Sequence, residues 1–239
     1  MNTRTLNANP YFYTALIAFA TLVVFVGFAP SFYLRGYFQA PPLPTLWVMH
    51  GVAFSAWMVL VLTQSLLVRA GQVQVHRRLG IAGAVLAGVM LVLGVQIARV
   101  AAAQGTIGLR AHLPPLEFLI IPLGQVLMFA GLTTAALLLR RRPDMHRRLM
   151  IVATIQLVAP AVVRASESLL HIASPAMAIV VLSLMVAACI VYDKMTRGRV
   201  HPVFAVLAPL TILTFPLRLL ISHTATWHSI AEWLVRGVQ

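Results

Sequence analysis

The amino-acid sequence predicts an all-α polytopic membrane protein, a bundle of seven transmembrane helices. The chain has 239 residues, of which 60% are hydrophobic and only 10% are charged. A soluble domain carries about a quarter charged residues, so a soluble enzyme is excluded. The net charge of +13 comes from short basic clusters between long apolar runs, a pattern typical of membrane proteins rather than of nucleic-acid binders. A single cysteine, Cys189, excludes a disulfide framework.

Seven apolar stretches reach the roughly 20 residues that a helix needs to cross a bilayer. In chain order they cover residues 12–33, 46–68, 79–98, 118–139, 149–170, 176–192 and 203–221. The first is too long for the apolar region of a signal peptide and lacks a good cleavage site, so we expect a retained helix. Pro160, Pro209 and Pro216 are expected to kink the spans that contain them. The whole chain, 1–239, is predicted to be one integral membrane domain.

The chain after the seventh span is predicted to lie in the membrane interface. Trp227, Ile230, Ala231 and Leu234 fall on one face of an expected helix at about 226–236. Such an amphipathic helix, with its tryptophans as anchors, lies in the plane of the headgroups.

Basic residues predict the orientation. Of the 18 Lys and Arg residues, twelve fall on one side of the predicted membrane and six on the other. The positive-inside rule then puts the N-terminus in the cytoplasm and the C-terminus outside. In a bacterium this is a multi-pass inner-membrane protein whose C-terminus faces the periplasm.

An internal duplication organises the central spans. His76-Arg77-Arg78-Leu79 recurs as His146-Arg147-Arg148-Leu149, and Leu62-Thr63 recurs as Leu132-Thr133 at the same offset. Each copy is predicted to be a two-helix unit with a basic turn. The copies share an orientation, so the symmetry axis is expected along the membrane normal.

These motifs carry a family resemblance over about residues 50–164. His50, Gln64, Arg69 and the His76–Gly80 run resemble the first half of the bacterial membrane proteins called the domain of unknown function 2306 family. The His146–Met150 run and the Ala159–Arg164 run are similar to their second half. The family usually has Trp at the position of Leu149, so the chain resembles a diverged member or a sister group. The resemblance implies a multi-span inner-membrane protein and implies no reaction.

Polar residues near the outer leaflet form the first candidate site. The predicted metal ligands are His50, His171, Glu167, His112 and His223. Imidazole nitrogens with a carboxylate suit zinc or iron. A second interpretation is transport, with Arg164, Glu167 and Arg218 as a charge relay. The third is structural, with the histidines at the headgroup level and Arg164 neutralising Glu167.

The second candidate site is at the inner boundary. The repeat predicts that His76 and His146 lie at equal depth, as two axial haem ligands require. The competing interpretation is that the neighbouring arginines reach anionic lipid headgroups and have no other role.

The sequence therefore favours a metal- or haem-binding redox or assembly protein with its ligands near the periplasmic face of the membrane. A small transporter is the alternative, and a structural subunit of a membrane complex is the third hypothesis. The expected partner is the lipid bilayer, with no nucleic acid. The pattern is also compatible with a homo-oligomer or with a place in a larger complex.

Overall fold

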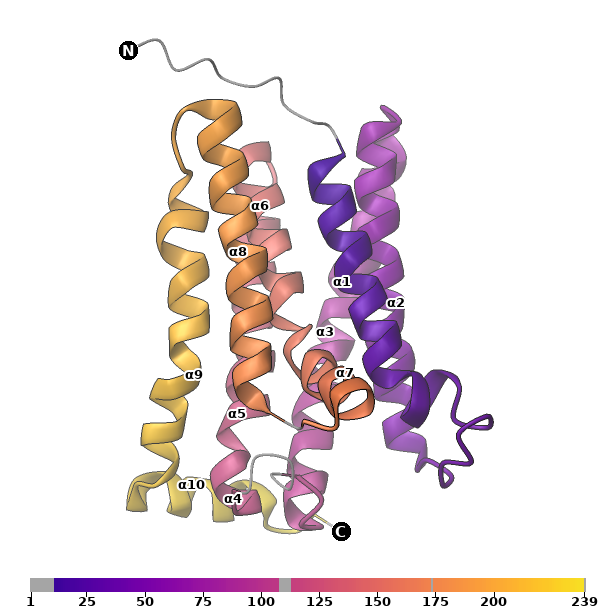
Figure 1. Cartoon of the computed structure of the whole chain (residues 1–239), viewed down its shortest axis with the longest axis vertical. Coiled ribbons are helices and arrows are strands. Elements are labelled where there is room, and N and C mark those ends of the chain that lie inside the picture. Colours follow the sequence, from indigo (N-terminus) through magenta and orange to yellow (C-terminus); the bar gives the residue numbers. More distant parts are fainter. Residues whose placement is uncertain (1–10, 108–112, 173, 239) are drawn as a thin grey trace.

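The computed structural model describes residues 11–107, 113–172 and 174–238. It is an all-α bundle whose long helices run up and down (Figure 1). Among the described residues, six helices are long and apolar enough to cross a membrane, and a bent pair of helices brings the number to seven. The prediction of a polytopic helical membrane bundle is confirmed.

Successive spans are antiparallel, as their short connections require. The elements that make the spans are α1 (Phe12–Phe28) with the π-helical turn η1 (Ala29–Tyr33), α2 (Thr45–Arg69), α3 (Val73–Ala103), α4 (Pro115–Phe118) with α5 (Ile120–Leu138), α6 (Pro143–Gln156) with α7 (Ala159–Leu170), α8 (Pro175–Arg197), and η3 (Val203–Leu207) with α9 (Ala208–Ser222). The turn between α2 and α3 uses Gly71 at φ 73°, a conformation that glycine adopts without steric cost.

The third span is longer than the predicted 79–98. With 31 residues, α3 extends about 46 Å, well beyond a hydrocarbon core of about 30 Å. His76 and the arginines after it lie in the first turns of this helix, as the repeat predicts.

The fifth span is broken into two helices, where the sequence predicts a single helix over 149–170 that is kinked at Pro160. Helices α6 and α7 meet at a bend of 41°, with Leu157 and Val158 between them. Pro160 lies in the first turn of α7, where its missing N–H costs nothing, and α7 turns away to pack against α1. The kink predicted at Pro160 is thus a change of helix axis.

The core lies between α1, α8 and the two central hairpins, α2–α3 and α5–α6. Helix α2 packs on α3, α5 packs on α6, and the two hairpins contact each other through α3 and α5. Trp57, Phe129 and Met90 are among the fully buried side chains of this core. Many large apolar side chains on the outside remain exposed, as expected of surfaces that face lipid.

The chain after α9 forms a short helix where the sequence predicts one. Helix α10 (Ala225–Val235) lies across the end of the bundle drawn at the bottom of Figure 1. Trp227 is buried and its Nε1 donates a hydrogen bond of 2.8 Å to the Leu116 carbonyl. We call this end the α10 end, and we call the opposite end, where α3 and α6 begin, the basic end.

Candidate functional site at the basic end

The two repeated histidines meet at the basic end. His76 lies in the first turn of α3, and His146 lies in the first turn of α6. Their ring centroids are 6.2 Å apart, and the ring planes are at 85°. The expectation of equal depth is therefore met by a direct juxtaposition of the two imidazoles, which the sequence alone did not establish.

Hydrogen bonds hold part of this pair in place. His146 Nδ1 donates 2.8 Å to the carbonyl of Ala136 on α5, because a carbonyl oxygen only accepts. His146 Nε2 is then the unprotonated nitrogen of the neutral ring. On the other side, Gln64 Nε2 donates 3.2 Å to the His76 carbonyl.

Two buried polar atoms next to this pair have no hydrogen-bond partner among the described residues. They are His76 Nδ1 and Gln64 Oε1. A buried polar atom left unsatisfied costs about 1–3 kcal/mol, so these two atoms are candidates for contact with a bound group. The pattern, with one His nitrogen fixed by a carbonyl and the other left free, is the usual support of a metal-ligating histidine.

The number of donors limits what the pair could hold. Among the described residues, no group of three or more His, Cys, Asp or Glu side chains is arranged to hold a metal ion. A structural zinc site needs four protein ligands, so the pair does not fit one. Haem iron needs only two axial ligands from the protein, and a single ion would complete its shell with Gln64 Oε1 or water.

A buried ion pair lies near these histidines, and the sequence interpretation missed it. Arg148 Nη2 and Nε donate to Asp193 Oδ1 and Oδ2 at 2.6 and 3.1 Å. Both side chains are fully buried. Tyr13 Oη donates 3.3 Å to Asp193 Oδ1, and the His201 backbone N–H donates 3.2 Å to Oδ2. The idea that Arg148 reaches lipid headgroups is therefore wrong, because its guanidinium points into the bundle.

The ion pair continues to the surface through Asp144. Arg148 Nη1 donates to the Asp144 carbonyl at 3.0 Å and to its Oδ1 at 3.2 Å. Asp144 Oδ2 also accepts 3.0 Å from Arg197. These contacts join α1, α6, α8 and the start of η3 at the basic end. One signal for this ion pair was available in the sequence. Acidic residues are scarce, five against 18 basic ones, so each acidic residue is a candidate partner for a buried arginine.

His201 closes the same cluster between α8 and η3. Its Nδ1 accepts a hydrogen bond of 3.2 Å from the Val203 backbone N–H. Burial, together with the nearby Arg148 guanidinium, lowers the pKa of His201 below its ordinary value of 6.5. The neutral imidazole is thus the form that the structure favours.

The histidines predicted as one outer metal site are distributed over the α10 half of the bundle. His50 stacks on Phe54 with ring centroids 4.1 Å apart. His171 ends α7 in the left-handed conformation and has an exposed side chain. His112 lies outside the described residues.

His223 instead contacts Glu117. Its Nδ1 is 2.9 Å from Glu117 Oε2, and His228 Nε2 is 3.7 Å from Oε1 of the same carboxylate. Glu117 therefore links the C-terminal end of α9 and the first turn of α10 to α4. This contact explains His223 without a metal ion.

Two residues of the predicted charge relay, Arg218 and Arg164, pack against different helices. Arg218 on α9 donates to the Ile121 carbonyl on α5 at 2.7 Å and to the Thr214 hydroxyl at 2.9 Å. Backbone oxygens and a hydroxyl thus satisfy its guanidinium. Arg164 lies on α7, with its guanidinium carbon 5.0 Å from the ring centroid of Phe28. Glu167 follows it on α7, and its pairing with Arg164 stays a prediction.

Comparisons with known proteins add no family. No protein-family model matches this chain, and neither a curated protein nor a solved structure was found to match it. The resemblance drawn from the His-Arg-Arg motifs therefore stays a prediction, and functional inference depends on the geometry.

Proposed function

We propose that this multi-span membrane protein holds a transition-metal centre, haem iron or a single ion, between His76 and His146. In this proposal it works as a membrane redox or assembly protein with its centre at the cytoplasmic side. The observation that supports this proposal most directly is the separation of 6.2 Å between the two imidazole centroids. Bonds of about 2.0–2.1 Å from an imidazole nitrogen to a metal would let two rings at this separation hold one ion.

The surrounding residues have defined roles in this proposal. Ala136 holds His146 Nδ1 through its carbonyl, so Nε2 is the ligand atom of that ring. His76 offers its buried Nδ1, and Gln64 positions the His76 backbone through its amide. An iron or copper centre would supply one-electron transfer when bound. The basic end is assigned to the cytoplasm by the positive-inside rule.

The test is the metal and haem content of protein purified from membranes. His76→Ala and His146→Ala are each expected to lose the bound metal or the haem absorption band while the protein still inserts. His228→Ala, which alters only the α10 end, should retain the full content. An absorption band with iron identifies haem, and metal without a band identifies a single ion.

The same experiment compares the two candidate sites. Loss of metal in His50→Ala or His171→Ala, with full content in His76→Ala, would overturn the proposal in favour of the outer site. Wild-type protein without metal or chromophore would also overturn it.

A transporter is the second candidate, and the broken fifth span favours it. Transporters often bind their substrate where a discontinuous helix leaves backbone groups free near the midplane. At this break Gln156 donates 2.5 Å to Thr211, and Gln125 donates to the Gln156 carbonyl. A measurement of proton flux into proteoliposomes tests this candidate. Flux that is present in the wild type and lost in Gln156→Leu would support it, whereas no flux above protein-free vesicles would exclude proton transport.

A further inference from the structure

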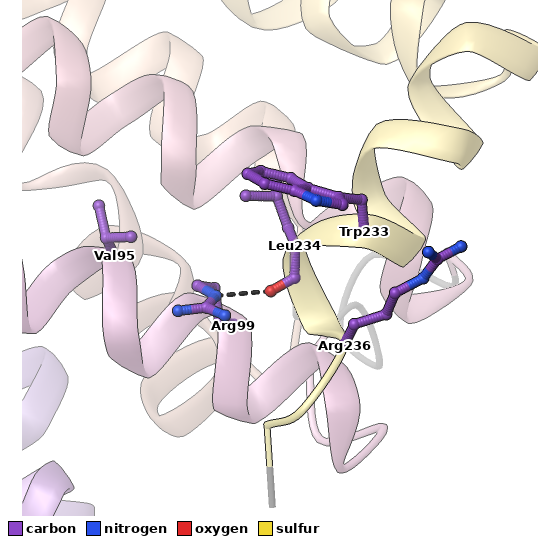
Figure 2. Close-up of a pocket in the computed structure, with 5 residues that line it drawn as sticks. All are labelled: Val95, Arg99, Trp233, Leu234 and Arg236. Carbon is purple, nitrogen blue, oxygen red and sulfur yellow. Dashed lines mark hydrogen bonds between the residues drawn. The ribbon is translucent and has the colours of Figure 1, made fainter.

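A hollow at the α10 end is separate from the sites above. It has a volume of about 460 Å³ and lies where the end of α10 crosses α3. Figure 2 shows Val95 and Arg99 on the α3 side, with Trp233 and Leu234 on the α10 side. Arg236 completes the wall, and its side chain points away from Arg99 in this view.

Arg99 brings an uncompensated positive charge into this hollow. Its Nε donates 2.6 Å to the Leu234 carbonyl, and its Nη1 donates 3.3 Å to Gln96 Oε1. A guanidinium has five N–H groups, so three of them make no hydrogen bond to a described residue. Among the described residues, no carboxylate forms an ion pair with Arg99. The free groups suit the oxygens of a phosphate, which arginine binds in a forked geometry.

An apolar stripe leads from the hollow along the outside of α3. Val92, Val89 and Val85 are 61%, 44% and 66% exposed, and their spacing of three and four residues puts them on one face of the helix. From Arg99 to Val89 the helix rises about 15 Å, half of a hydrocarbon core of about 30 Å. The stripe therefore covers the depth of one leaflet below the guanidinium.

We infer that this hollow binds one anionic phospholipid, with the lipid phosphate on Arg99 and an acyl chain along Val92 and Val89. Trp233, which is 66% exposed, borders the glycerol region, where indole rings prefer to lie. A second cation on the rim, Arg236, favours a headgroup with net negative charge. The inference is independent of the centre proposed at the basic end.

The test follows the thermal unfolding of detergent-solubilised protein while phosphatidylglycerol is added. The wild type should be stabilised by phosphatidylglycerol, less by phosphatidylcholine, and not by inorganic phosphate. Arg99→Gln should raise the half-saturating concentration of phosphatidylglycerol about tenfold, the equivalent of one lost charge-assisted hydrogen bond. Arg35→Gln is the matched control, because Arg35 is at the same end and donates to the Pro41 carbonyl.

Three results would overturn the inference. The first is an Arg99→Gln variant that responds to phosphatidylglycerol like the wild type. The second is equal stabilisation by phosphatidylcholine, and the third is equal stabilisation by inorganic phosphate, which would indicate a simple anion site. If Arg99→Gln does not fold, Trp233→Ala replaces it, and an unchanged half-saturating concentration in that variant would also contradict the inference.

Discussion

Replacing Asp193 by asparagine should be among the most destabilising single changes at the basic end. The Asp193 carboxylate accepts two hydrogen bonds from Arg148, one from Tyr13 and one from the His201 backbone. An asparagine keeps one acceptor oxygen and turns an N–H₂ group toward the donors. The guanidinium of Arg148 would then lose its buried counter-charge and keep only the more exposed carboxylate of Asp144.

The magnitude follows from the burial of both partners. Breaking a buried pair by removing one partner costs about 3–5 kcal/mol. Because Arg148 keeps its two bonds to Asp144, we expect the lower part of that range. For a chain of this size, a loss of about 3 kcal/mol lowers Tm by roughly 6–12 °C. The double change Arg148→Met with Asp193→Leu should recover most of the loss, since an apolar pair leaves no buried charge.

Cys189 provides the assay. It is the chain's only cysteine and is fully buried, so a maleimide dye that fluoresces on reaction reports unfolding as the sample is heated. Asp144→Asn is the control, because Asp144 is 56% exposed and an exposed ion pair contributes less than about 1 kcal/mol. Equal Tm values for Asp193→Asn and Asp144→Asn would refute the reasoning.

Three further predictions concern packing, pH and orientation. Gly27→Leu should lower Tm strongly, because a Cβ at Gly27 would collide with the Ala161 backbone, whereas Gly131→Ala, in open space, should be neutral or stabilising. The folded-state pKa of His201 lies below its unfolded value of about 6.5. The unfolded state therefore binds the proton more readily, and Tm should fall as the pH drops through 6.5. His201→Gln should reduce this dependence; an equal slope in the wild type and in His201→Gln would contradict the assignment. A reporter fused after α10 should read as external and one in the turn between α5 and α6 as cytoplasmic, with the reverse pattern contradicting the orientation.

Hydropathy predicted the fold class because lipid imposes one simple requirement on a spanning segment. Each span must be apolar and must satisfy its own backbone hydrogen bonds, and both properties are visible in the sequence. A kink at Pro160 was predicted, but the division of the span into two helices, α6 and α7, was not, because it depends on packing. Helix α7 leaves the axis of α6 where Gly27 lets α1 approach the Ala161 backbone. Gly27 and Ala161 are far apart in the sequence, so the residues around Pro160 alone do not reveal this contact.

The candidate site was predicted in part. The repeat identified His76 and His146, because equivalent positions in two copies of a hairpin lie at equal depth. It did not identify Asp193, which follows the predicted end of the sixth span at residue 192 and so resembled a loop residue. In the structure α8 continues to Arg197 and brings Asp193 to Arg148, a contact between residues 45 positions apart. No group of three metal-ligating side chains forms among the described residues, so a shared role for the outer histidines stays a prediction.

The most direct test of the proposed centre is the stoichiometry of metal or haem iron per chain in protein purified from membranes. Wild-type protein is expected to carry about one equivalent, held by the two imidazoles whose centroids are 6.2 Å apart. The double variant His76→Ala with His146→Ala should carry none, while its cysteine-dye unfolding curve still shows a folded bundle. An unchanged equivalent in that double variant, or a wild type without metal, would contradict the account.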